Sequence, residues 1–267
     1  MDLQMYYLDP EYLNALAQRY RESYASADPF PHTVIDNFLP ERILDSILEE
    51  FPQPGSIDWQ RFEAAAEKKL ASKSEQQMGA ATRLLLYQLN SSTFISFLET
   101  LTGITGLIPD PHFEGGGLHQ IEPGGYLKMH VDFSRNDRLK LDRRLNLLIY
   151  LNKDWKEEYG GHLELWDKDV TQLSKKILPL FNRCVIFNTT DFTFHGHPEP
   201  LTCPPGNTRK SLALYYYSNG RPAHETRGGQ HSTLFRARPG ETIDFEKPKR
   251  SPKELVKKLL PGLSRRS

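Results

Sequence analysis

The second half of this chain is divided into short β-type segments. From about residue 115 onward, runs rich in β-branched and aromatic residues alternate with clusters of Gly, Pro, Asp and Asn. There are eight such runs: "GLHQIEP", "YLKMHVDF", "RLNLLIYLN", "GGHLELWD", "KKILPL", "RCVIFNT", "FTFHGHP" and "RKSLALYYYS". Many short strands separated by turn residues are typical of a β-sandwich or a β-barrel. The sequence therefore predicts an all-β core in this half of the chain.

The first hundred residues have mainly helical patterns. Pro40 begins a segment with an apolar stripe along one face. The stripe consists of Ile43, Leu44, Ile47, Leu48 and Phe51. The segments "AAAEKKLASK" and "TRLLLYQL" follow, and a last helix begins at Ser91 or Ser92, whose hydroxyl can cap it. "HTVIDNFL" has the pattern of a short strand. We expect these elements to form a support for the β core.

The domain organisation follows from these patterns. We expect one domain over residues 1–246, of class α+β with a mainly β core: a helical front part, residues 1–110, covers one sheet of a core at about residues 115–218. Residues 247–267 carry eight Lys or Arg against one Glu, so they hold a formal charge of +7. The whole chain is neutral, and the rest therefore carries −7. This basic tail is either a solvated end or a contact for an anionic partner.

Composition indicates the cellular compartment of the protein and excludes some classes of site and partner. The chain has no apolar run near 18 residues, and its first residues, "MDLQMYYLDPEY", do not resemble a signal peptide. We expect a cytoplasmic protein without a transmembrane segment. The two cysteines, Cys184 and Cys203, predict neither a disulfide framework nor a thiolate metal site. Apart from the tail, nothing indicates a specific nucleic-acid partner.

His130 and Asp132 are two residues apart in the predicted strand "YLKMHVDF", so both side chains face the same side of a sheet. A His-x-Asp pattern is common by chance, and alone it is compatible with a core or surface histidine. The stretch "FTFHGHP" adds two more histidines, His195 and His197. Two histidines and one carboxylate can occupy one face of an octahedral ferrous ion and leave three positions open. Such a site can take a bidentate organic acid together with dioxygen.

A later strand supplies a second charged group. Arg209 and Ser211 are two residues apart in "RKSLALYYYS", and both therefore face one side of the sheet. A guanidinium suits the distal carboxylate of a metal-chelating diacid, and a serine hydroxyl can add a donor. A purely structural metal site has no need of such an anchor.

These motifs together resemble one family. The run His130-Val131-Asp132, the stretch "YLNKDW", the pair Gly160-Gly161, His195 and the ending Arg209-x-Ser211 resemble the 2-oxoglutarate- and Fe(II)-dependent dioxygenases. The likeness is greatest to the prolyl 4-hydroxylase-like group, which includes the oxygen-sensing prolyl hydroxylases and bacterial relatives. It covers about residues 115–218 and implies a double-stranded β-helix, or jelly roll, with N-terminal supporting helices.

The resemblance also implies roles for individual residues. His130, Asp132 and His195 would be the iron ligands, and Arg209 would hold the distal carboxylate of 2-oxoglutarate. Tyr150 matches a tyrosine that shares this carboxylate. By strand alternation Asn146 has the same orientation as Tyr150, and we count it, with Ser211, among the cofactor-binding residues. Dioxygen would be the co-substrate and ascorbate a reductant.

The choice between the two histidines of "HGH" rests on an interval. In the oxygen-sensing relatives an arginine begins the strand twelve residues before the iron histidine, and Arg183 and His195 have this separation. His195 is therefore the expected ligand. His197 then lies either at the pocket wall or in a loop stiffened by Pro198.

The sequence departs from the group at positions near the expected pocket. Gln120 and Leu127 stand where many prolyl hydroxylases have tyrosines. Gln120 lies an even number of residues before His130, so by strand alternation we expect its side chain to face the cofactor as well. Arg143 and Arg144 precede the central strand and would place positive charge near the pocket mouth. Arg143 matches an arginine that lies close to the substrate in the oxygen-sensing relatives.

The predicted function is hydroxylation of an unactivated C–H bond, coupled to conversion of 2-oxoglutarate to succinate and CO₂. The substrate is a small molecule or a peptide or protein: peptidyl proline, a free amino acid, a glycan and a natural product remain open. The alternative is a metal-binding jelly-roll or cupin module that does not turn over 2-oxoglutarate.

Overall fold

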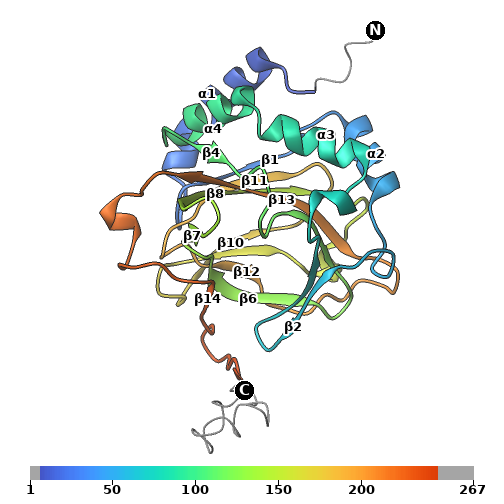
Figure 1. The fold of residues 1–267 in the computed structure, drawn as a ribbon. Coiled ribbons are helices and arrows are strands. Elements are labelled where there is room, and N and C mark those ends of the chain that lie inside the picture. The colour runs from blue at the N-terminus through green and yellow to red at the C-terminus, as the bar shows by residue number, and fades with distance from the viewer. Residues whose placement is uncertain (1–6, 246–267) are drawn as a thin grey trace, which may run out of the picture.

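The computed structural model describes residues 7–245 and consists of a layer of helices on a curled β-sheet (Figure 1). The basic tail predicted at residues 247–267 lies outside the described residues. The four α-helices are α1 (Pro10–Ala25), α2 (Glu41–Glu50), α3 (Ala80–Leu89) and α4 (Ser92–Thr102). Asp9 caps α1, and Ser91 caps α4 by accepting a hydrogen bond from the amide of Phe94. None of the helices in residues 7–245 has the length and apolar character needed to cross a membrane.

The strands belong to one continuous hydrogen-bonded sheet. They are β1 (His32–Ile35), β2 (Gln60–Ala64), β3 (Glu67–Ala71), β4 (Ile108–Pro109), β5 (Gly117–Ile121), β6 (Tyr126–Val131), β7 (Arg135–Asn136), β8 (Leu141–Tyr150), β9 (Leu163–Trp166), β10 (Leu173–Ile177), β11 (Cys184–Asn188), β12 (His195–His197), β13 (Arg209–Ser218) and β14 (Leu234–Phe235). The main path runs β1-β11-β8-β13-β5-β3-β6-β12-β9-β10. Short 3-10 helices lie at Glu75–Gln77, Glu157–Tyr159 and Ala223–Glu225.

The sheet folds back on itself into two facing layers. One layer contains β1, β11, β8, β13 and β5, and the other contains β6, β12, β9 and β10 (Figure 1). From β6 onward the chain passes repeatedly between these layers, so strands that are distant in sequence become neighbours. This is a double-stranded β-helix. All eight predicted strands are present, and the helices cover one layer, as expected from the sequence.

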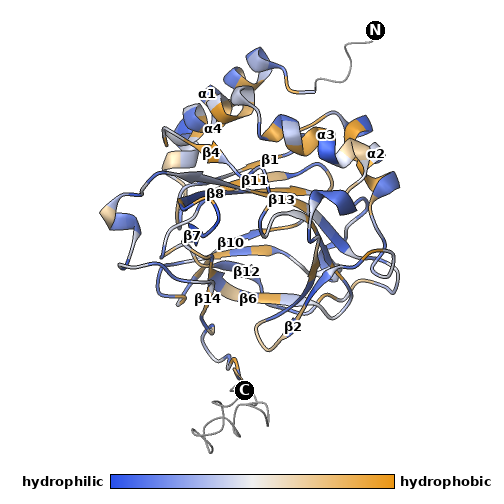
Figure 2. Ribbon diagram, in the orientation of Figure 1, coloured by the Kyte–Doolittle hydropathy of each residue, from blue (hydrophilic) through white to orange (hydrophobic). Residues whose placement is uncertain are grey.

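The strand-alternation rule divides the long strand β8 between two environments. Leu145, Leu147 and Ile149 belong to the main apolar core, which the helices complete. Asn146 and Tyr150 have the opposite orientation, toward the space between the two layers. Apolar residues, orange in Figure 2, lie along α3 and along the strands below it. The inner face of this layer therefore carries polar side chains together with a second, smaller apolar cluster that includes Tyr150 and Phe187.

The segment predicted as helical at residues 64–73 is instead part of a β-hairpin. β2 and β3 pair antiparallel, with Phe62 opposite Lys69. β3 then joins the main sheet between β5 and β6. The helical interpretation of "AAAEKKLASK" is therefore wrong. Its alanines and lysines favour a helix when isolated, but the tertiary structure supplies two strands with open hydrogen-bonding edges, and pairing with them outweighs local propensity.

Residues 219–245 form a C-terminal strap along β6. β14 in the strap lies beside β6 (Figure 1). In this pairing Phe235 is opposite His130. The buried Asp191 anchors the strap with both carboxylate oxygens. Its four contacts are Arg221 (3.0 Å), His231 (2.8 Å), Thr226 (3.1 Å) and the amide of Arg227 (2.7 Å). The strap therefore covers the part of β6 near His130, on the edge whose other part pairs with β3.

The aromatic contacts of Phe94 join the helices to the sheet, and they allow a test of this packing. Phe94 is fully buried, and its ring centroid lies 5.1 Å from that of Phe97 and 6.2 Å from that of Tyr216 in β13. We expect Phe94→Ala to lower the free energy of unfolding by about 3–5 kcal/mol, measured by urea denaturation. Tyr12→Ala, at an exposed position of α1, is the control and should change it by no more than about 0.5 kcal/mol. Equal effects would contradict the assigned core.

Candidate active site

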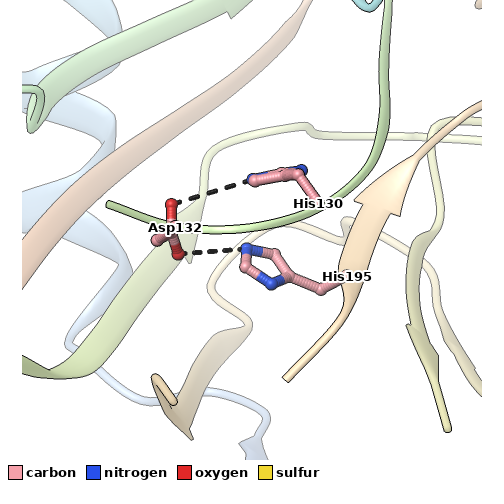
Figure 3. A group of neighbouring side chains, drawn as sticks. All are labelled: His130, Asp132 and His195. Atoms are coloured by element: carbon pink, nitrogen blue, oxygen red, sulfur yellow. Dashed lines mark ion pairs between the residues drawn. The ribbon is translucent and has the colours of Figure 1, made fainter. Parts of the chain in front are cut away.

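Three side chains with metal-ligating atoms converge between the two layers (Figure 3). His130 is in β6, Asp132 follows the end of that strand, and His195 begins β12. The two strands pair with His195 directly opposite His130. Nε2 of His130 lies 3.7 Å from Oδ1 of Asp132, and Nε2 of His195 lies 3.3 Å from Oδ2. The ligand atoms of all three residues lie within 4.8 Å of one another, so they could hold one metal ion.

Backbone carbonyls orient both imidazoles toward this shared space. Nδ1 of His130 lies 2.9 Å from the carbonyl oxygen of Lys128, and Nδ1 of His195 lies 3.0 Å from that of Thr193. A carbonyl can only accept, so each Nδ1 carries the proton and each Nε2 presents its lone pair to the metal position. Burial also lowers the pKa of His130, which favours the neutral imidazole that a metal requires.

Two neighbours hold the carboxylate of Asp132. Nδ2 of Asn146 donates to Oδ2 at 2.8 Å, and Nη2 of Arg143 lies 3.3 Å from Oδ1. Burial opposes ionisation of Asp132, but the charge of the nearby Arg143 guanidinium holds its pKa well below the usual range. Asp132 therefore stays an anionic ligand, and the donor set of two neutral imidazoles and one carboxylate fits a ferrous ion.

The expected position of Arg143 at a solvated pocket mouth is wrong. β8 begins at Leu141, so Arg143 lies inside the strand, and it is 1% exposed. Its guanidinium donates to Oδ1 of Asn146 through Nε (3.0 Å) and Nη2 (2.6 Å), and it lies over the rings of Tyr215 and Phe133. Arg144 is also buried, on the other side of β8, bonded to Ser218 and Glu225. Arg143 thus supports the ligand Asp132.

A second polar group lies on the same inner face. Nε of Arg209 donates to the carbonyl oxygen of Gly161 at 2.8 Å, and one Nη donates to the hydroxyl of Tyr150 at 3.2 Å. Gly161 has φ +72°, and a Cβ there would lie 2.9 Å from Cδ of Arg209, which explains why glycine is needed. Ser211 lies opposite Tyr150 on the neighbouring strand. The structure thus brings together Arg209, Tyr150 and Ser211, as predicted, and the second Nη of Arg209 takes part in neither bond.

Gln120 does not face this group, contrary to the expectation from parity. It lies opposite Lys210 in the β5–β13 pair, whereas His119 lies opposite Ser211. Cross-strand partners share a face, so His119 has the inner orientation and Gln120 the outer one, where its amide donates to Thr208 at 2.8 Å. The expectation assumed that side chains alternate without interruption from Gln120 to His130. The turn "EPGG" lies between them, and alternation holds only within a single strand. His119 was missed for this reason.

His197 lies on the inner face but outside the triad. Within residues 7–245, the metal-ligating group consists of His130, Asp132 and His195, so of the two histidines of "HGH" it contains His195 and not His197. Burial and the charges of Arg209 and Lys69 hold the pKa of His197 well below its usual range. Lys69 is a further residue that sequence reasoning missed, because its hairpin was read as a helix.

Comparison with known proteins agrees with this geometry. Residues 116–217 match the family model described as the 2OG-Fe(II) oxygenase superfamily. This segment contains the triad, Arg209 and Tyr150. Residues 116–217 are therefore similar to the domains of that superfamily.

Individual relatives of this oxygenase domain are distant in sequence. The chain is 24% identical over 200 residues to prolyl 3-hydroxylase OGFOD1 of Mus musculus, covering 71% of this chain and 33% of the mouse protein. The chain thus spans about a third of the length of this relative. A prolyl-4-hydroxylase from Pseudomonas putida superposes with a TM-score of 0.55 at 17% identity, over 78% of this chain and all of that one. A Trichoplax adhaerens prolyl hydroxylase in complex with a hypoxia inducible factor peptide fragment superposes with a TM-score of 0.53 at 18% identity. The match covers 78% of this chain and 91% of that one. Both show the double-stranded β-helix fold.

The assigned triad predicts which histidine is needed for metal binding. We expect His130→Ala, Asp132→Ala and His195→Ala each to weaken binding of Fe(II) or Mn(II) and to abolish turnover, because each removes one of three ligands. His197→Ala should leave metal affinity unchanged. Isothermal titration with Mn(II) measures this directly. Loss of metal in the His197 variant, with retention in the His195 variant, would reverse the assignment.

The support of Asp132 by Arg143 predicts an effect on the metal without any change of ligand. We expect Arg143→Ala to weaken Mn(II) binding by about 10–100-fold, the usual cost of losing a group that orients a metal ligand. Arg144→Ala is the matched control, since this neighbouring buried arginine bonds Ser218 and Glu225 instead. Equal losses of metal affinity in both variants would show a general folding defect and not a specific support.

Proposed function

We propose that this chain is an Fe(II)- and 2-oxoglutarate-dependent dioxygenase that hydroxylates an unactivated C–H bond. The observation that carries the proposal is the pairing, on one inner face, of an open three-residue metal site with a buried arginine. Three protein ligands leave three positions on an octahedral ion, which suits a bidentate 2-oxo acid and dioxygen. Arg209, fixed by Gly161 and Tyr150, gives the distal carboxylate of that acid a partner.

The residues of the chain then act by holding and orienting. Bound iron would supply the oxidative chemistry, in which 2-oxoglutarate, dioxygen and substrate become succinate, CO₂ and hydroxylated product. Arg209 and Tyr150 fix the cosubstrate, while Arg143 and Asn146 fix Asp132. The rings of Phe187 and Phe235 lie 4.7 Å and 5.6 Å from the imidazoles of His195 and His130, measured between centroids. These rings restrict the access of water to the two imidazoles.

The alternative is a metal-binding jelly-roll module without turnover of 2-oxoglutarate. A storage or structural site does not need a buried arginine held beside an open metal position. The decisive experiment is formation of succinate from 2-oxoglutarate by the full chain with Fe(II) under air. Succinate release that depends on Fe(II) and on the triad supports the dioxygenase. Metal binding without succinate release, even in the presence of peptides, amino acids and sugar-containing small molecules, would support the metal-binding module instead.

For the substrate, we propose a prolyl residue in a peptide or protein. Support comes from the printed descriptions of the relatives: prolyl 3-hydroxylase for the mouse protein and prolyl hydroxylases for the two solved structures. The test is mass spectrometry for gain of one oxygen in three panels: proline-containing peptides, free amino acids and sugar-containing small molecules. Hydroxylation confined to the non-peptide panels would rule out the prolyl substrate and leave the dioxygenase proposal intact.

Removal of the carboxylate anchor gives a kinetic test of the cosubstrate. We expect Arg209→Ala to raise the apparent KM for 2-oxoglutarate by about tenfold or more, because a hydrogen bond to a charged group contributes about 1.5–3 kcal/mol. Tyr150→Phe should have a smaller effect in the same direction, and Mn(II) affinity should change little in both. Lys210→Ala, on the opposite face of the same strand, is the control. An unchanged KM in the Arg209 variant would exclude this anchor.

A further inference from the structure

His197 is a buried side chain whose polar atoms have no partner. It is 4% exposed, and neither ring nitrogen makes a hydrogen bond within residues 7–245. The imidazoles of His130 and His195 differ, since each has its Nδ1 fixed by a carbonyl. Buried polar groups in folded proteins nearly always have partners, and an unsatisfied one costs stability. A ligand that completes these bonds would account for His197.

The sheet register shows where this imidazole lies. His197 is opposite Leu127, and Leu127 is opposite Glu67 on the next strand. Its ionisable neighbours include Arg209, Lys69 and His130. His197 therefore lies on the inner face, in the neighbourhood of both Arg209 and the metal-ligating triad. A molecule that spans from the metal to Arg209 would pass beside it.

The short strand β12 is held in this position by a close approach to β6. A Cβ on Gly196 would lie 2.7 Å from the carbonyl oxygen of Leu127 and 2.8 Å from that of Lys128. The pairing also shifts register between His195 and His197. This irregular pairing, together with burial, fixes the orientation of His197, so its unpartnered state is not that of a freely rotating surface histidine.

We propose that His197 donates a hydrogen bond to the distal carboxylate of 2-oxoglutarate, beside Arg209. This inference rests on the proposed function, because it assumes that the 2-oxo acid chelates the metal at one end. A neutral imidazole has one N–H donor to give. Lys69, the other cation near His197, is already paired with Glu67 at 3.0 Å. His197 is thus a buried donor without a partner within residues 7–245, and Arg209 is among its neighbours.

The test separates the carboxylate contact from general damage to the pocket. The full chain is loaded with Mn(II) without oxygen, and two ligands are titrated by calorimetry: 2-oxoglutarate and 2-oxopentanoate, in which a methyl group replaces the distal carboxylate. The apolar variants are His197→Leu and His197→Ala, so that a misfit of one does not decide the result. His197→Gln retains an N–H donor. His32→Leu changes another buried histidine, whose Nδ1 is already bonded to Phe30.

We expect both apolar variants to bind 2-oxoglutarate about tenfold or more weakly, which corresponds to about 1.4 kcal/mol. Their affinity for 2-oxopentanoate and for Mn(II) should be unchanged, and His197→Gln should recover part of the loss. The melting temperature of ligand-free His197→Leu should not fall, because leucine fills much of the same space and removes an unsatisfied polar group. His32→Leu should lower the melting temperature without affecting the binding of 2-oxoglutarate.

Several outcomes would overturn the assignment of His197 alone. The first is unchanged binding of 2-oxoglutarate in the apolar variants, and the second is an equal loss of affinity for both ligands. The third is a lower melting temperature in both apolar variants, which would attribute the loss of affinity to general destabilisation. Failure of the unaltered protein to bind 2-oxoglutarate at all is a different result. It would reject the proposed function, and the inference with it.

Discussion

The antiparallel pairing of β6 with β12 is the constraint on which the candidate site depends. It places His195 directly opposite His130, although the two residues are far apart in the chain. Gly196 makes this approach possible, because any Cβ there would collide with the backbone of β6. The strap adds β14 on the other edge of β6, with Phe235 opposite His130. His130 is therefore held from both sides, and the metal-ligating geometry follows from main-chain pairing more than from side-chain packing.

The alternation of residues along β8 and β13 separates stability from function. One face of β8 packs against the helices with leucine and isoleucine, and the other carries Asn146 and Tyr150 toward the site. The helices thus bury the outer face of the layer and leave its inner face available for polar groups. Those groups are costly to bury singly, and they occur as bonded sets: Arg143 with Asn146 and Asp132, and Arg209 with Tyr150.

His197 stands apart from these bonded sets. Arg143 is almost fully buried and has its partners within the protein, whereas both nitrogens of the buried His197 have none within residues 7–245. Natural proteins keep such locally unfavourable groups chiefly at functional sites, where a ligand supplies the missing interaction. The inner face therefore has two kinds of polar residue: those that the protein itself holds in place, and those that are completed by what binds.

The sequence alone determined the eight strands and the shared faces of His130 with Asp132 and of Arg209 with Ser211, because turn residues and a period of two are local properties of the chain. The choice of His195 and the role of Tyr150 came from the resemblance to a known family. Tertiary structure decided the rest. The hairpin at residues 60–71 forms because β5 and β6 offer it edges, against the helical propensity of its residues. The orientation of Gln120 depends on the turn between β5 and β6, because strand alternation does not continue through a turn. Arg143 is buried because Asp132, Tyr215 and Phe133 surround it, and no local pattern reports such neighbours.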